Sequence, residues 1–350
     1  MDSFGAKISS GRGVMMGAAI LFIMFFHLQS GHFGWWSNFC NCYGLWGVDV
    51  FMFLSGYGIA HSLRSWGRGQ AGGKGLGEFY RKRLVRILPV CVVSGTLFYM
   101  LAEPAQAGLK AMLLQVSGMD MWYVRVILLC YLFSPLFLWV MRRWCSWWLM
   151  LGLVVAVELL LLWLSITLQP AHFPMNLYAT TVCWGLARLP AYLMGLFVAE
   201  KAAAAAAAPA AGAKMTPWGY LLPPAVLCLG FSLVARYMFS SGQGFWRSDY
   251  WDLMPLAALA FTLPVLCALA GLCLQHLPQW LLRVPRAVLE WCGRHSLELY
   301  VVHLPLYPII ARSGVEPAYY PYFAMGLSAL LAWLLHLMVA QLCFPSPPSR

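Results

Sequence analysis

Long apolar runs, separated by short polar loops, follow one another along most of the chain. Each run is about 20 residues long, which is the length that crosses the hydrocarbon core of a bilayer as a helix. The runs are continuous, whereas a membrane β-barrel shows alternating segments of roughly ten residues. We therefore predict an all-α integral membrane protein: a single domain over residues 1–350, built as a bundle of about ten transmembrane helices. The predicted spans are residues 13–31, 44–63, 84–101, 120–141, 147–168, 180–199, 218–239, 252–274, 295–312 and 320–343.

The composition strengthens this prediction. Hydrophobic residues make up 61% of the 350 residues and charged residues only 10%, whereas a typical soluble domain has about 25% charged residues. A soluble core of this size cannot hide so much apolar surface, so lipid must be the solvent for most of it. The net charge of +11 would suggest a nucleic-acid partner in a soluble protein. In a membrane protein it indicates basic cytoplasmic loops.

The basic residues are divided unevenly between the loops. Alternate sets of loops hold 17 and 3 of the lysines and arginines, and the remaining three lie within predicted spans. Cytoplasmic loops carry the excess, so we predict an even number of spans with both termini cytoplasmic. The first apolar run lacks a small-residue cleavage site and is predicted to be a retained helix. The alanine-rich stretch within residues 201–216 is predicted to be a cytoplasmic linker or the frayed end of a helix.

Four ionisable side chains, those of His27, Asp49, Arg125 and Arg188, lie within predicted spans toward the outer surface. At about 1.5 Å per residue, His27 and Asp49 lie about 6 Å and about 7 Å from the outer ends of two adjacent antiparallel spans. We therefore expect them to pair, which would make His27 a better general base. Intramembrane charges can also neutralise one another simply to hold helices together, but four at similar depth favour a polar pocket.

A basic segment, RKRLVRILP at residues 81–89, lies at the cytoplasmic end of the third span. Arg83 and Arg86 are three residues apart and share a helix face. Arginines in this position can clamp a polyphosphate through charge-assisted hydrogen bonds. Basic segments beside a membrane more commonly contact anionic lipid and fix the topology, so the residues alone leave both interpretations open.

A segment near the C-terminal end, CGRHSLELYVVHLP at residues 292–305, contains Arg294, His295, Glu298 and His303. Glu298 and His303 are five residues apart and do not share a helix face, and no zinc-binding pattern completes the set. The eleven cysteines are scattered and include no Cys-x-x-Cys pair, so they support neither a zinc site nor a disulfide framework. We predict no metal site.

Four motifs together resemble those of bacterial acyltransferase family 3. In chain order they are a first helix that ends in FFH, GVDVFMFLSGYGIAHSL, RKRLVRILP and GRHSLELYVVHLPL. The resemblance covers the chain from about residue 12 to residue 340. Members of this family are multi-pass acyltransferases of the bacterial cytoplasmic membrane, and many are O-acetyltransferases of surface polysaccharides. Some carry an additional extracytoplasmic domain, so a chain that ends at residue 350 is expected to be a stand-alone form.

The resemblance implies an activity. The chain would take an acetyl or other short acyl group from cytoplasmic acyl-CoA and pass it to a hydroxyl of a surface or lipid-linked glycan. Acyl-CoA would be a substrate, and no permanently bound cofactor or nucleic-acid partner is expected. His27 matches the first-helix histidine that is held to be the catalytic base. We expect Arg125 or Arg188 to stabilise the developing oxyanion.

Other matches imply a donor site. Arg83 and Arg86 match the arginine pair that is held to bind acyl-CoA from the cytoplasmic side. Asp49, Ser55 and Gly56 match an aspartate and a Ser-Gly motif in the second helix, and we expect the last two to lie where the acyl-CoA arm passes.

One departure concerns the first helix. The family usually has a basic residue eleven positions before the histidine, which here is Met16. Arg12 lies one turn further toward the cytoplasm on roughly the same side of the helix and is the candidate replacement.

Two other functions remain open from the residues alone. A multi-helix transporter of a polar solute would also place charges at depth, although it would be expected to show internal repeats and broken helices in corresponding halves. A binding protein that has lost catalysis would account for Met16.

Overall fold

The computed structural model describes residues 4–28, 39–40, 43–67, 75–101, 108–118, 121–144, 146–167, 177–207, 225–226, 228–230, 232–234 and 259–343. The regular structure in these ranges is helical throughout. The helices are α1 (Phe4–Leu28), α3 (Trp46–Gly67), α4 (Leu76–Leu101), α5 (Leu109–Val116), α6 (Trp122–Arg143), α7 (Trp147–Thr167), α8 (Leu177–Ala207), η3 (Leu259–Phe261), α11 (Leu263–His276), α12 (Gln279–Arg294), α13 (Ser296–Arg312) and α14 (Tyr320–Cys343).

The structure confirms an all-α membrane bundle. Seven of the described segments are long and apolar enough to cross a membrane: α1, α4, α6, α7, α8, η3 together with α11, and α14. Two further predicted spans are also helices. α3 contains charged residues, including Asp49 and Arg64, and α13 is 17 residues long with Pro305 and Pro308 inside it. The predicted span at residues 218–239 lies largely outside the described residues.

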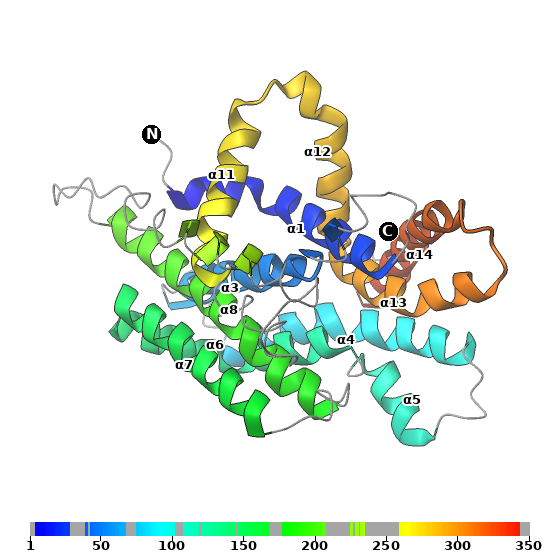
Figure 1. Cartoon of the computed structure of the whole chain (residues 1–350), viewed down its shortest axis with the longest axis horizontal. Helices are drawn as coiled ribbons and strands as arrows, with labels where there is room; N and C mark the ends of the chain where they lie inside the picture. The colour runs from blue at the N-terminus through cyan, green and yellow to red at the C-terminus, as the bar shows by residue number, and fades with distance from the viewer. Residues whose placement is uncertain are drawn as a thin grey trace, which may run out of the picture.

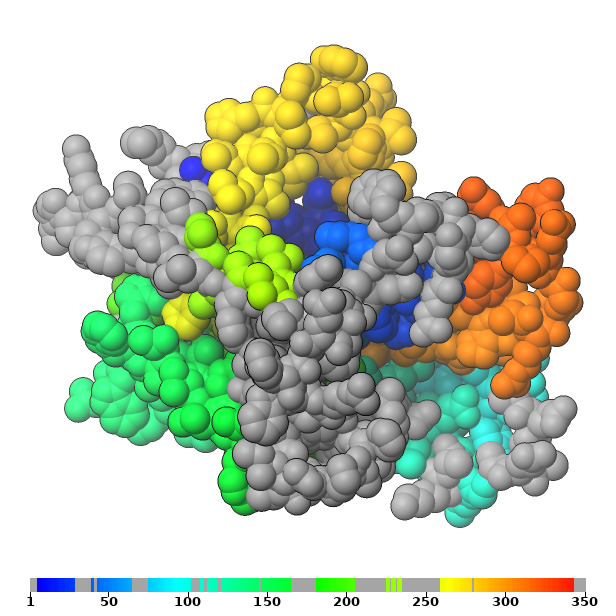
Figure 2. All heavy atoms as spheres, viewed as in Figure 1, coloured from blue at the N-terminus to red at the C-terminus, as the bar shows by residue number. Residues whose placement is uncertain are grey.

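Two features differ from the prediction. The predicted loop with Arg283 and Arg286 is a helix, α12, which forms a projecting hairpin with α11 (Figures 1 and 2). Helix α8 continues to Ala207, beyond the predicted end of its span at residue 199, so the first part of the alanine-rich stretch is the end of this helix. Alanine has the highest helix propensity, which explains the extension. The rest of that stretch lies outside the described residues.

Close backbone contacts hold the centre of the bundle together. Helix α3 packs most extensively against α8, and α1 packs against α12, α11 and α3. A Cβ atom added at Gly56 would lie 2.1 Å from the carbonyl oxygen of Tyr192, and one at Gly195 would lie 2.1 Å from that of Phe53. Only glycine allows the backbones of α3 and α8 to approach so closely. This contact fixes how α3 presents its polar residues to its neighbours.

Candidate active site

A polar cavity of about 370 Å³ lies between α1, α3, α4, α6 and the junction of α12 with α13. We call it the arginine cavity, because four arginines from three helices line it. They are Arg12, Arg83, Arg86 and Arg294. Its other lining residues include Met16, Ser55, Tyr123, Tyr131, Ser296 and Tyr300. Residues separated by almost 300 positions thus meet around one space.

The charges of the arginine cavity are not balanced by acids. None of its four arginines forms an ion pair with a carboxylate in the described part of the chain. Arg83 donates a hydrogen bond to the Ser62 hydroxyl at 3.0 Å, and its guanidinium lies 5.9 Å from the Tyr131 ring centre. The Nε atoms of Arg12 and Arg83 are buried without a hydrogen-bond partner. Buried polar atoms without hydrogen-bond partners are costly, and four arginines without carboxylates around one space suit an anion with several charges.

The arginine cavity also contains the position at which the first helix has Met16 in place of a basic residue. Met16 and Arg12 both line it, so Arg12 directs a guanidinium into the same space that Met16 borders. A Cβ atom added at Gly58 would lie 3.1 Å from a terminal nitrogen of Arg12. Glycine at that position of α3 therefore leaves room for the arginine. Arg12 as the replacement for a basic residue at Met16 stays a prediction, and its place in the cavity is compatible with it.

Asp49 pairs with Arg188 rather than with His27. Its Oδ1 atom lies 3.9 Å from the Nε atom of Arg188, and both side chains are fully buried, at 0% exposure. The Arg188 guanidinium lies 4.6 Å from the Trp122 ring centre and 5.1 Å from that of Trp184. At such distances cation–π attraction adds to the ion pair. A buried ion pair therefore joins α3 to α8 beneath two tryptophans.

His27 pairs instead with His303. The Nδ1 atom of His27 lies 3.3 Å from the Nε2 atom of His303 and 2.9 Å from the carbonyl oxygen of Ile23. The Nδ1 atom of His303 lies 2.9 Å from the carbonyl oxygen of Leu299. His303 is fully buried and His27 is half-buried. The expected His27–Asp49 hydrogen bond is absent, since neither Asp49 carboxylate oxygen has a hydrogen-bond partner among the described residues.

Aromatic rings connect the arginine cavity to the histidine pair. Tyr123 and Tyr300 both line the cavity, and their ring centres lie 5.3 Å apart. The Tyr300 ring centre lies 5.8 Å from that of His303. Tyr300 is one turn before His303 on α13, so the two side chains lie on neighbouring parts of one helix face. Tyr300 therefore lies between the arginine cavity and His303.

The other predicted site residues fall in separate places. Ser55 lines the arginine cavity. Gly56 is not among the residues that line it and instead packs against the backbone of α8. Arg125 is buried and its Nε atom donates to the Thr181 hydroxyl at 2.8 Å. That bond holds α6 to α8.

Sequence reasoning missed the roles of two C-terminal residues. In the segment at residues 292–305, the sequence alone indicates no partner for His303 and no cavity for Arg294. The one available signal was their occurrence in GRHSLELYVVHLPL, because contacts between α1 and α13 cannot be read from spacing. Glu298, on the same segment, accepts a hydrogen bond from His336 at 2.9 Å. Within the described residues no three His, Cys, Asp or Glu side chains are grouped to hold a metal ion.

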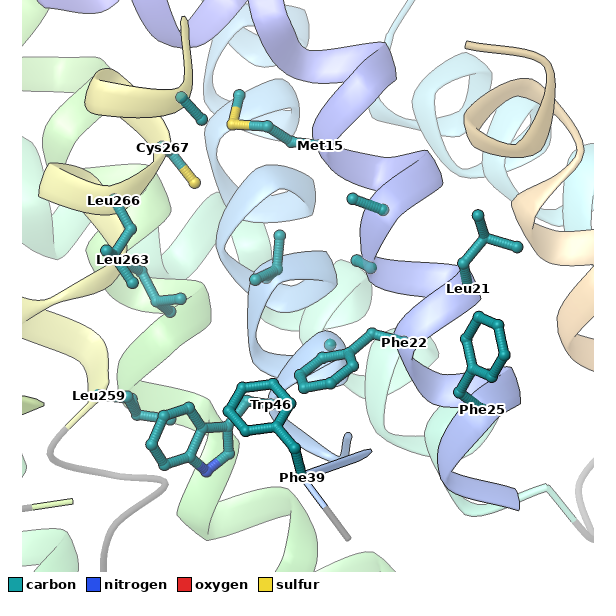
Figure 3. Close-up of a pocket in the computed structure, with 15 residues that line it drawn as sticks. Met15, Leu21, Phe22, Phe25, Phe39, Trp46, Leu259, Leu263, Leu266 and Cys267 are labelled. Atoms are coloured by element: carbon teal, nitrogen blue, oxygen red, sulfur yellow. The ribbon is translucent and has the colours of Figure 1, made fainter. Parts of the chain in front are cut away.

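A second cavity, of about 560 Å³, is lined by apolar side chains instead of arginines. Its lining side chains come from α1, α3, η3 and α11 together with Phe39, and they are apolar (Figure 3). Phe22 of α1 extends toward Trp46 and Phe39, and Leu263 and Leu266 of α11 lie on the opposite side of the cavity. None of the described residues that line this apolar cavity carries a charge that could hold a phosphate.

Comparison with known proteins gives one result that covers almost the whole chain. The family model described as an acyltransferase domain matches residues 14–340. No curated protein and no solved structure matches the chain. The match includes every lining residue of the arginine cavity except Arg12 and Gly13, and both members of the Asp49–Arg188 and His27–His303 pairs.

Proposed function

The chain belongs to the family of acyltransferase domains, and we propose that it moves an acetyl or other short acyl group from acyl-CoA to a hydroxyl of a surface or lipid-linked glycan. The donor would bind from the cytoplasmic side and the acceptor from the outer side of a bacterial cytoplasmic membrane, with both chain termini cytoplasmic. The single observation that carries this proposal is the arginine cavity beside the histidine pair.

The arginine cavity supports a donor with phosphate groups. Arg12, Arg83, Arg86 and Arg294 converge on it without carboxylate partners in the described part of the chain. Guanidinium groups match phosphate oxygens in charge and in planar geometry. Ser55, Tyr123 and Tyr300 border the same cavity and would line the route of the pantetheine arm toward His27.

His27 supports the chemical step. In the proposed reaction its Nε2 atom takes the proton of the acceptor hydroxyl, and the oxygen attacks the carbonyl carbon of the thioester. The C–S bond breaks, the CoA thiolate leaves, and the proton finally reaches its sulfur. General base catalysis of this kind contributes about 10²–10⁴-fold to the rate, and positioning of the two substrates supplies much of the rest.

The donor site is tested by acetyl-CoA binding to the purified chain. We expect R83Q/R86Q to raise the dissociation constant at least about tenfold, because each hydrogen bond to a charged group contributes about 1.5–3 kcal/mol. R283Q is the matched control, because Arg283 is exposed on α12 and does not line the arginine cavity. Unchanged affinity in R83Q/R86Q would contradict the donor site.

The acceptor is tested in cells. Mass spectrometry of surface glycans from cells with and without the chain should show an acyl-sized mass difference, which identifies the acyl group and the acceptor together. Identical glycan masses would count against the proposed acceptor class. Transport of a polar solute into liposomes that contain the chain but no acyl donor would instead favour the transporter.

A further inference from the structure

The hydrogen positions in the histidine pair follow from its geometry. A carbonyl oxygen can only accept a hydrogen bond, so the Nδ1 atoms that face Ile23 and Leu299 at 2.9 Å must both carry hydrogen. A neutral imidazole carries one hydrogen, so the Nε2 atom of His303 is an acceptor. The 3.3 Å contact is therefore a bond from the Nδ1–H group of His27 to the Nε2 atom of His303.

This arrangement leaves one nitrogen of the pair available. The Nε2 atom of His27 has no hydrogen in this tautomer, and no partner for it is found among the described residues. His27 is half-buried, whereas His303 is fully buried. A substrate can therefore reach only His27, and His303 acts through it.

We propose that His303 is a positioning residue that receives the Nδ1 proton of His27 during acyl transfer, so that the two rings carry one proton as a unit. This inference rests on the proposed function, in which His27 is the base. It assigns to a histidine of α13 the part that sequence reasoning gave to Asp49.

The proton movements balance. As the Nε2 atom of His27 takes the hydroxyl proton, its Nδ1 proton moves along the 3.3 Å contact to the Nε2 atom of His303. The positive charge then lies on His303, whose Nδ1–H group still donates to Leu299. When the C–S bond breaks, the proton on His303 returns to the Nδ1 atom of His27, and the Nε2 proton passes to the CoA thiolate. Both rings end as they began.

A carbonyl partner alone cannot perform this function. Ile23 can orient the imidazole of His27 but cannot accept its proton, whereas His303 can do both. The other titratable side chains in described contact with either ring are the phenols of Tyr300 and Tyr307, at ring-centre distances of 5.8 Å and 5.4 Å from His303. Phenols ordinarily titrate near pH 10, with a pKa of about 10, so they do not compete for this proton near neutrality.

The kinetic test separates orientation from proton acceptance. It measures CoA release from acetyl-CoA by the full chain in liposomes made from lipids of the producing cells. H303F removes both nitrogens and should lower the rate at least about 10²-fold, with acetyl-CoA affinity unchanged. H303Q restores an acceptor oxygen but no proton site, and should remain at least about tenfold below the parent. The control is H276F, since His276 is exposed on α11.

Three outcomes would overturn the relay. They are a parental rate in H303F, a parental rate in H303Q, and a loss of acetyl-CoA affinity in H303F that accounts for its lower rate. A slow H303F with parental affinity and an intermediate H303Q support it.

A second measurement does not depend on activity. Nitrogen-15 NMR of histidine-labelled protein should show hydrogen on the Nδ1 atom of both rings. On acidification the signals of both rings should move together in one step, because coupled sites share the first proton. Protonation of one ring alone would contradict the proposal. If the parent protein released no CoA, the proposed function would fail, while these spectra would still decide whether the pair shares a proton.

Discussion

The Asp49–Arg188 pair joins α3 to α8, whereas the His27–His303 pair joins α1 to α13. The first consists of opposite charges, both fully buried at 0% exposure, and two tryptophans lie against the arginine. The second consists of two imidazoles that are neutral in the tautomer described above. One of them, His27, is half-buried, and its Nε2 atom is available to a substrate. The bundle thus contains a pair suited to holding helices together and a pair suited to moving a proton.

The difference between the two pairs shows that neither burial of a side chain nor its depth in the membrane is enough to identify a catalytic group. A buried ion pair fixes two helices, and its members are costly to separate. A base needs a free lone pair within reach of the substrate, and among the four side chains of the two pairs His27 meets this requirement. The predictions that follow test this division of roles, from the largest expected effect to the smallest.

Replacement of His27 tests the proton-moving pair. H27A should lower CoA release from acetyl-CoA by about 10²–10⁴-fold, because no other described group supplies the base. The unfolding temperature in detergent should stay close to that of the parent, since His27 is only half-buried. The matched control is H276A, at an exposed histidine of α11. A near-parental rate in H27A would remove His27 from the mechanism.

Replacement of Arg188 tests the structural pair. R188L leaves the Asp49 carboxylate buried without its counter-charge and should lower the free energy of unfolding by about 3–5 kcal/mol. D49L/R188L removes both charges and should recover most of that loss. Unfolding of the purified variants in mixed detergent, followed by circular dichroism, measures both changes. Equal losses in the single and double variants would show that the two residues are not coupled.

A methyl group at Gly56 tests the packing on which the structural pair depends. In G56A the new Cβ would lie 2.1 Å from the Tyr192 carbonyl oxygen, so α3 and α8 must separate at a cost of about 1–3 kcal/mol. G152A is the control, because a Cβ there meets nothing within 4 Å; it should be neutral or stabilising by up to about 1 kcal/mol. Parental stability in G56A would mean that the approach of α3 to α8 is looser than described.

The fold was largely predictable because the bilayer imposes a length and a composition on each span. Every predicted span that falls within the described residues is helical, and the order of the motifs identified the family that the match to residues 14–340 confirms. Helix α12 is not predicted from the sequence, because its arginines and Pro285 are residues typical of a polar loop between two spans.

The pairing of site residues was not predictable, for a geometric reason. Depth along a helix follows from residue number, but rotation about its axis does not follow from depth. Consecutive residues differ by about 100° around the helix axis, so two side chains at one level can face different neighbours. His27 and Asp49 are on contacting helices, yet one faces α13 and the other faces α8. The partner of His27 lies 276 positions away, beyond any local spacing rule.

Helix α1 runs without interruption from Phe4 to Leu28, and it contributes Arg12 to the cavity and His27 to the histidine pair. These residues are fifteen positions apart, which corresponds to a rise of about 22 Å along a rigid helix. In the proposed reaction, a donor must therefore carry its phosphates and its acyl carbon at a comparable separation. Acyl-CoA does so, whereas an acyl phosphate, whose phosphate adjoins the acyl carbon, cannot contact both residues at once. The enzyme would thus select its donor by molecular length.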